Sequence, residues 1–230
     1  MRKYLVGILV VAACLTVLVP SLAKADTLVN PNITGHGAGI VNNSFYVGPY
    51  TLVDQIAPPF TDSLWYCFNA AQELSSPWWA LETNLQGAID FGNLTRNQNV
   101  IIGTNTYTYY SDNVLREVAY LASETPGKDP VQLAAINVAI WEMMGNFTLT
   151  SCNFDNNCSS VAAYYNDAIT NGPNFTGDAN FLIPLQGNGT SLTWNPQNQP
   201  FVQTPEPGSF LVFGSALGWL GFALRRHLKF

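Results

Sequence analysis

The cysteines offer the widest choice of chemistry in this 230-residue chain. Cys14 lies in an apolar N-terminal stretch, which leaves Cys67, Cys152 and Cys158 in the body of the chain. Cys152 and Cys158 flank a short polar loop, and in an oxidising compartment this spacing favours a local disulfide. Cys67 is then the odd cysteine, which is either a reactive thiol or a small apolar residue of the core.

The sequence contains few histidines that could serve in catalysis or metal binding. His36 is the only histidine between residues 26 and 203, and it lies in the glycine-rich stretch 34–39. A Cys67–His36 nucleophile pair is one alternative, and a solvated histidine, which is usual beside glycines, is the other. A zinc site built from several His and Cys side chains is disfavoured. The sequence therefore predicts no metal site and no cofactor.

Carboxylate pairs are a second source of catalysis. Asp54 with Asp62, or Glu73 with Glu82, could supply the acid and base of a glycosidase. With 14 acidic residues between positions 26 and 203, such pairs also arise by chance. A hydrolase of matrix glycans is kept as an alternative function.

The tryptophans could bind sugars without catalysing a reaction. Consecutive strand residues point to opposite faces, so one of Trp78 and Trp79 should face outward. An exposed indole can stack on a sugar ring. Extracellular polysaccharide is accordingly a candidate partner.

Charged residues make up 10% of the chain, whereas about 25% is usual in soluble proteins. Between residues 26 and 203, three basic residues stand against 14 acidic ones, a net charge of −11. The polarity of this region comes from 23 asparagines, together with Thr, Ser and Gln. Binding to a phosphate backbone needs clustered Lys and Arg, so nucleic acid is not a predicted partner.

The N-terminal 25 residues have the organisation of a secretory signal peptide. Arg2 and Lys3 precede an apolar stretch over residues 4–20, and Ala23-Lys24-Ala25 supplies small residues for cleavage before Asp26. An uncleaved membrane anchor and lipidation at Cys14 are the alternatives. The signal peptide reading predicts export.

The C-terminal end has three parts. Pro205-Glu206-Pro207 is followed by an uncharged apolar run over residues 209–224 and then by Arg225 and Arg226. At about 1.5 Å per residue the run covers roughly 24 Å, which is short for a bilayer but workable with Leu228 and with snorkelling basic residues. Basic residues prefer the cytoplasmic side, so residues 26–203 should lie outside.

This tail resembles the PEP-CTERM sorting signal of Gram-negative bacteria that make extracellular polysaccharide. The resemblance implies recognition by an exosortase, a membrane-embedded cysteine protease that would cut near Pro205, Glu206 and Pro207. Glu206 is the residue expected to matter most for recognition, and Arg225 and Arg226 are the membrane stop. The precursor is then anchored in the inner membrane before the domain reaches the cell surface or the extracellular matrix.

A second resemblance concerns the region between the two ends. Tyr66-Cys67, residues 119–122 and residues 135–142 occur in the order seen in the outer domains of many PEP-CTERM proteins. The pattern is also similar to bacterial thioester adhesin domains, which pair a Tyr-Cys motif with a Gln four residues before a Trp. Asn137 stands at the Gln position, four residues before Trp141, so the sequence departs from that pattern at the reacting carbonyl. The alternative is that Asn137 satisfies a backbone group in the core.

Periodicity and turn signals predict a mixed set of elements. A helix should begin near Ser111 or Asp112. A nearly all-apolar and therefore buried helix should follow Asp129, with Gln132 completing a capping box. A third should run from Ser159 or Ser160 to about residue 171. Residues 34–39 should be too flexible for a strand interior. Strands are predicted at 45–53 with a break at Gly48-Pro49, and at 64–68, 78–83, 99–110 with a turn at 103–105, 181–185 and 191–194.

Together these patterns predict an α+β protein, with a β-rich sandwich or barrel ectodomain that carries a small helical subdomain. The predicted organisation is a signal peptide at 1–25, an ectodomain at 26–194, a linker at 195–203, and a sorting signal at 204–230 that holds a transmembrane helix at 209–224. The predicted function is a non-enzymatic surface or matrix protein sorted by an exosortase. A thioester-type adhesin that uses Cys67 and Asn137 is the other alternative.

Overall fold

The structure is a computed structural model of the chain. It describes residues 27–37, 39–42, 45–55, 64–67, 78–95, 100–102, 105–107, 109–145, 147–155, 158–187, 192–195 and 200–203. In this part of the chain, no helix combines the length and the apolar character that crossing a bilayer requires. The predicted signal peptide and the predicted transmembrane segment lie outside the described residues.

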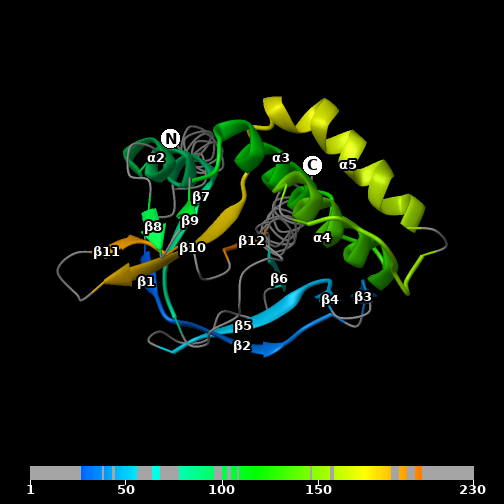
Figure 1. Cartoon of the computed structure of the whole chain (residues 1–230), viewed down its shortest axis with the longest axis horizontal. Helices are drawn as coiled ribbons and strands as arrows, with labels where there is room; N and C mark the ends of the chain where they lie inside the picture. The colour runs from blue at the N-terminus through cyan, green and yellow to red at the C-terminus, as the bar shows by residue number, and fades with distance from the viewer. Residues whose placement is uncertain are drawn as a thin grey trace, which may run out of the picture.

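The main element is a strongly curled antiparallel sheet (Figure 1). Its strands follow the order β1-β7-β10-β12-β6-β5-β2, and β11 pairs with β10. Their bounds are β1 Thr27–Val29, β2 Pro31–Gly35, β5 Tyr50–Asp54, β6 Leu64–Cys67, β7 Trp79–Asn84, β10 Asn180–Gly187, β11 Leu192–Trp194 and β12 Phe201–Gln203. Within the part of the chain that the structure describes, two hairpins stand apart from this sheet: β3 Gly39–Val41 with β4 Phe45–Val47, and β8 Val100–Ile102 with β9 Asn105–Tyr107.

The first two strands explain the curl. β1 and β2 are separated by Asn30 alone, yet they lie at opposite ends of the strand order. The Asn30 amide donates to Oδ1 of Asp54 at 3.0 Å, and its carbonyl accepts from the amide of Gln55 at 3.0 Å. The continuous segment made of β1, Asn30 and β2 therefore supplies both edge strands of the sheet. This connection holds the two edges close together and bends the sheet into a half-barrel.

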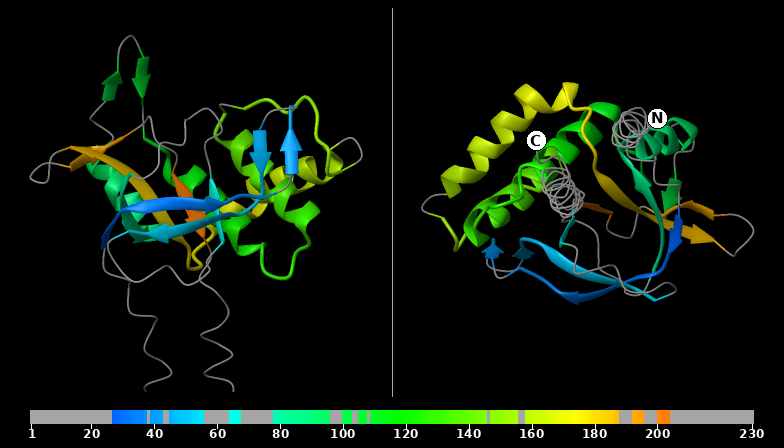
Figure 2. Two further views of the ribbon diagram at one scale, coloured as in Figure 1. Left: turned by 90° about the horizontal axis from the view of Figure 1, so that it is seen from below. Right: turned by 180° about the vertical axis from the view of Figure 1, so that it is seen from behind.

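In the described residues, four α-helices accompany the sheet: α2 Leu85–Thr95, α3 Asp112–Ser123, α4 Pro130–Met143 and α5 Ser159–Asn171, the last followed by the 3-10 helix η2 Gly172–Asn174. The helices α3, α4 and α5 gather on one side of the molecule, while the β8–β9 hairpin stands out from the sheet (Figures 1 and 2). The fold is thus α+β, as predicted, with an open half-barrel as its β part.

The helix ends follow local sequence signals. Ser111 caps α3 by accepting from the amide of Val114. Asp129 and Gln132 form a reciprocal capping box at the start of α4, with bonds of 2.9 and 3.1 Å. These local groups satisfy amides that have no partner inside the helix.

The core lies between the curled sheet and α4. Every residue of α4 from 134 to 141 is buried, Asn137 included. On the sheet, Cys67 pairs with Phe201, and Phe201 pairs with Leu182, so their side chains point to one face. Trp78 stacks on Phe201 with ring centroids 5.7 Å apart. The central strands thus contribute large apolar side chains to a single core.

Three predictions about elements need correction. Residues 34 and 35 belong to β2, which tolerates the glycine through a register shift between Ile33 and Gly35. Helix α2 was not predicted, because Gly87 and Gly92 weaken its signal. Gly92 is needed there, since a Cβ atom would lie 2.8 Å from the Tyr109 ring.

The predicted linker 195–203 is the third correction. Pro200 and the three residues of β12 are buried, and β12 lies between β10 and β6 in the sheet. A three-residue strand has too little sequence for a period-2 pattern to show, and its neighbours in the sheet decide its conformation. The folded domain therefore extends to Gln203 instead of ending at residue 194.

Candidate functional site

The structure brings the two predicted thioester positions together. Cys67 ends β6 and is fully buried, and its thiol forms no disulfide. The Cys67 carbonyl accepts two hydrogen bonds from α4, one from Nδ2 of Asn137 at 2.7 Å and one from Nε1 of Trp141 at 2.9 Å. Asn137 and Trp141 are four residues apart, which places them on one face of the helix.

Asn137 also reaches a third segment. Its Oδ1 accepts from the Gly48 amide at 3.0 Å, at the break between β4 and β5. Gly48 has a φ of +110°, a conformation that glycine adopts readily. Asn137 thereby joins α4, β6 and the β4–β5 connection, and both ends of its buried amide are hydrogen-bonded.

This geometry bears on thioester chemistry. A thioester would join Sγ of Cys67 to Cγ of Asn137 and expel Nδ2 as ammonia. In the structure, Nδ2 donates to the backbone carbonyl of Cys67. Bond formation would therefore remove the donor of a 2.7 Å hydrogen bond in the core.

The surroundings of Cys67 are apolar and aromatic. Tyr50 lies nearby, and burial, with a smaller contribution from Cys67, holds the pKa of its hydroxyl well above the usual range. That hydroxyl donates to the carbonyl of Tyr46 at 2.9 Å. Burial keeps the Cys67 side chain away from solvent, whereas reactive cysteines are at least partly exposed.

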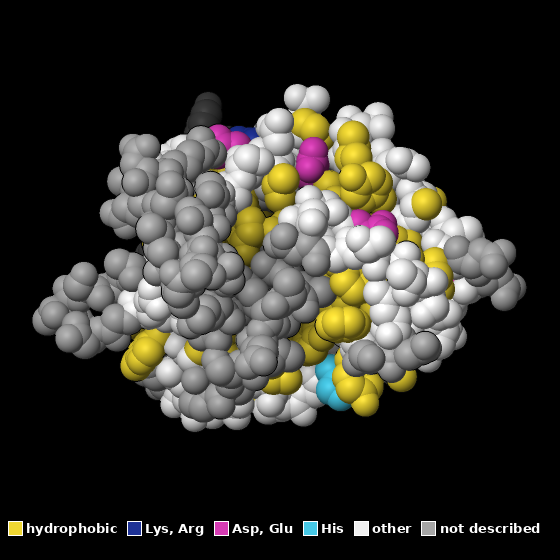
Figure 3. Space-filling view, viewed as in Figure 1, with side chains coloured by type: hydrophobic (Ala, Val, Ile, Leu, Met, Phe, Trp, Pro, Cys, Tyr) yellow, Lys and Arg dark blue, Asp and Glu magenta, His cyan; other side chains and the backbone are white. Residues whose placement is uncertain are grey.

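His36 lies elsewhere, at the surface. Its ring is 4.2 Å from the ring of Tyr46, and its Nδ1 lies 2.9 Å from the carbonyl oxygen of Gly37. On the face of the molecule drawn in Figure 3, a histidine side chain (cyan) lies next to hydrophobic side chains. An exposed His36 and a buried Cys67 do not have the arrangement of a nucleophile–base pair.

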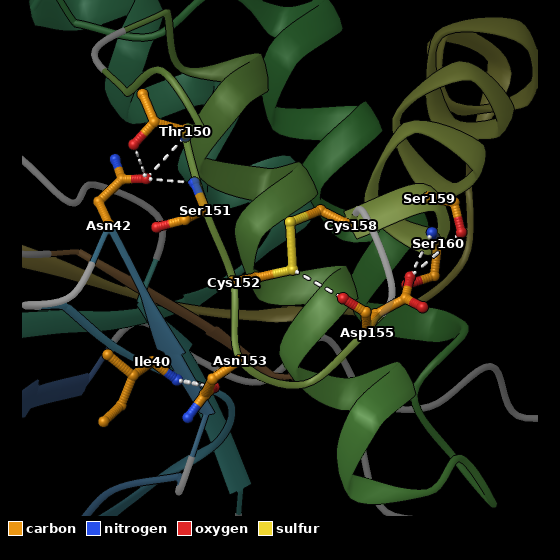
Figure 4. Close-up of a disulfide and its surroundings, with 10 residues drawn as sticks. All are labelled: Ile40, Asn42, Thr150, Ser151, Cys152, Asn153, Asp155, Cys158, Ser159 and Ser160. Carbon is orange, nitrogen blue, oxygen red and sulfur yellow. Dashed lines mark hydrogen bonds between the residues drawn. A yellow bond between two sulfur atoms is a disulfide. The ribbon is translucent and has the colours of Figure 1, made fainter.

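The predicted disulfide between Cys152 and Cys158 is present (Figure 4). Its Cα atoms are 6.0 Å apart. Asp155, inside the loop, accepts from the amide of Ser160 at 2.8 Å and from its hydroxyl at 2.7 Å. This carboxylate therefore stabilises the start of α5. Among the described residues, no three His, Cys, Asp or Glu side chains are grouped to hold a metal ion.

Asn42 fastens the β3–β4 hairpin to the segment before the disulfide (Figure 4). Its Oδ1 accepts from the amide and the hydroxyl of Thr150, both at 2.7 Å, and from the amide of Ser151 at 3.1 Å. Its Nδ2 donates to the carbonyl of Thr148 at 2.9 Å. The role of Asn42 could not be predicted from the sequence, since its partners lie more than 100 positions away.

The carboxylate pairs are only half described. Asp54 and Glu82 are buried, and Asp54 accepts from the Asn30 amide. Their proposed partners Asp62 and Glu73 lie outside the described residues. The same holds for the tail residues Pro205, Glu206, Pro207, Arg225 and Arg226.

The tryptophans follow the predicted alternation. Trp78 is 5% exposed, whereas Trp79 is 41% exposed. Trp65, Trp141 and Trp194 are buried. Trp79 is therefore the described indole that is open to solvent.

Compared with known proteins, the chain matches no protein-family model, no curated protein and no solved structure. Its function is accordingly argued from its own residues.

Proposed function

We propose that this chain is an exported, non-enzymatic protein of the cell surface or extracellular matrix of a Gram-negative bacterium. An exosortase sorts it through residues 204–230. The observation that carries the proposal is the order of Pro205-Glu206-Pro207, an uncharged apolar run and Arg225-Arg226. A proline-bounded extended segment suits a protease site, because it resists forming a helix.

The folded domain is compatible with this role. The Cys152–Cys158 disulfide suits an oxidising compartment. Few charged side chains are visible on the described surface in Figure 3, which suits contact with neutral, hydrated sugars. Cys67 is buried and His36 is exposed, which argues against a thiol enzyme built on these two residues.

The test is the fate of a Glu206→Ala variant in cells with and without the exosortase. We expect the variant to remain uncut in the inner membrane, as the wild type does without the enzyme. Thr204→Ala, two residues away, is the matched control and should be processed normally. Normal processing of Glu206→Ala would remove the sorting proposal.

A thioester-type adhesin is the second candidate, favoured by the contact between Asn137 and Cys67. The intact mass of the native ectodomain decides it. A mass lower by one ammonia, after allowance for the disulfide, would support the internal bond. A mass that shows no loss of ammonia would eliminate the thioester-type adhesin.

A further inference from the structure

Both ends of the described domain lie at the same end of the sheet. On β7, Glu82 pairs with Thr27 of β1, and Asn84 pairs with Asn180 of β10. Asn180 pairs in turn with Gln203, the last residue of β12. The chain therefore enters the domain and leaves it at the C-terminal end of β7.

The points where the chain enters and leaves the domain are close together. β1 and β12 are three strand positions apart, which corresponds to about 14 Å. Only residues 204–208 separate Gln203 from the apolar run that begins at residue 209. The six residue-to-residue steps from Gln203 to residue 209 span at most about 22 Å when extended, so an anchor in that run would hold this end of the sheet near the bilayer.

Exposed leucines flank the same end. Leu28 follows Thr27 on β1 and is 43% exposed. Tyr66 pairs with Val202, so Leu64 lies level with the position where the chain continues past Gln203. Leu64 is 45% exposed. These two leucines lie near the points where the chain enters and leaves the domain, and contact with an apolar or interfacial environment would remove them from water.

We propose that this end of the sheet rests on the membrane surface while the chain is anchored. We name it the tether rim and define it by Thr27, Leu28, Leu64, Asn84, Asn180 and Gln203. The inference rests on the proposed function, because the anchor is the apolar run of the sorting tail. The partner is a lipid surface, because the tether is too short to let the rim diffuse away and because Leu28 and Leu64, two of its exposed side chains, are apolar.

Site-specific fluorescence quenching tests the contact. Leu64→Cys and Leu28→Cys are labelled with a small fluorophore in the full-length Glu206→Ala chain and placed in vesicles of phosphatidylethanolamine and phosphatidylglycerol that carry nitroxide-labelled headgroups. We expect both rim labels to lose most of their emission. Trp79→Cys is the matched control, because Trp79 is exposed but lies at the opposite end of β7.

A tether variant provides an independent measurement. A long Gly-Ser insertion after Thr204 should relieve much of the quenching at the rim and leave the Trp79 label unchanged. The chain without an added cysteine corrects for labelling of Cys67, which is buried.

Two failures are distinguishable. If alkaline carbonate extracts the uncut chain from the vesicles, the anchoring proposal fails and the inference fails with it. If the chain stays in the bilayer but the rim and Trp79 labels are quenched equally, or the insertion changes nothing, the tether rim alone is overturned.

Discussion

Asn137 and Asn42 each tie distant segments together, one in the core and one near the surface. Asn137 is fully buried and joins β6, α4 and the Gly48 turn. Asn42 is half-buried and holds the β3–β4 hairpin to residues 148–151. In both residues the amide oxygen accepts and the amide nitrogen donates hydrogen bonds. The two side chains therefore differ in their burial and not in the kind of bond that they form.

The two asparagines show how burial changes the contribution of one type of side chain to stability. If Asn42 is removed, water can reach Thr150 and Ser151. If Asn137 is removed, the Gly48 amide is left in the core without its acceptor. We therefore expect substitutions in the core to cost more than those at the surface, and the following predictions test that order.

Asn137→Ala should cause the largest loss, about 3 kcal/mol of unfolding free energy, because it leaves the buried Gly48 amide without its acceptor, removes one of the two donors to the Cys67 carbonyl and opens a small cavity. Urea unfolding followed by circular dichroism measures it. Asn113→Ala, at an exposed position of α3, is the matched control and should change little. A cost for Asn137→Ala no larger than the control would contradict the role given to this amide.

Removing the disulfide should come next. Cys152→Ser with Cys158→Ser should cost about 2 kcal/mol, since the bridge closes a short loop and restrains the unfolded chain only modestly. Reduction of the wild type should lower the urea midpoint by the same amount as the double substitution. A loss equal to that of Asn137→Ala would mean that the loop matters as much as the core.

Alkaline pH should expose a third effect. Burial raises the pKa of Tyr66 to about 12 from its ordinary value of 10.0, against an opposing hydrogen bond from Thr125. Below pH 10 this contribution to stability is fully present. Between about pH 10 and about pH 12 the unfolded state loses the proton first, so stability should fall by up to about 1.4 kcal/mol per pH unit.

Tyr66→Phe should flatten that slope when urea midpoints are compared across the alkaline range. Tyr120→Phe is the corresponding substitution at a tyrosine nearer the surface. The pKa of the Tyr120 hydroxyl is also raised to about 12, by desolvation first and then by the hydrogen bond to Asp167. Added salt should weaken the Asp167 contribution and leave the Tyr66 slope in place. A salt-sensitive Tyr66 slope would argue against burial as its cause.

The smallest of these effects should come from Asn42. Asn42→Ala should cost about 1 kcal/mol, because it removes surface hydrogen bonds and places alanine at a φ of +48°. Asn42→Gly keeps the backbone conformation accessible and should cost less. If glycine proves worse than alanine, the backbone argument is wrong and the side-chain bonds alone decide the effect.

Much of the fold could be predicted from local signals. The capping box at Asp129, the cap at Ser111 and the strand break at Gly48-Pro49 are all present. Each depends on residues close in sequence, where side-chain and backbone preferences act directly. The disulfide was predicted for the same reason, since Cys152 and Cys158 are six positions apart.

The candidate site could be predicted only as a pairing. The pattern paired Cys67 with Asn137, and in the structure the Asn137 side chain contacts the backbone carbonyl of Cys67. The partner atoms were not predictable, because the backbone carbonyl of Cys67 and the amide of Gly48 reach Asn137 only after β6, α4 and the β4–β5 turn assemble.

By itself, the sequence determined the helix caps, the strand breaks, the low charge and the three-part tail, because these depend on residue type and short spacing. Only the tertiary structure decided that residues 201–203 form β12, that β1 and β2 turn the sheet into a half-barrel, and that Thr27 and Gln203 lie at one end. A short strand gains its stability from the hydrogen bonds and side chains of its neighbours. Its place in the sheet is therefore written in contacts between residues far apart in the chain.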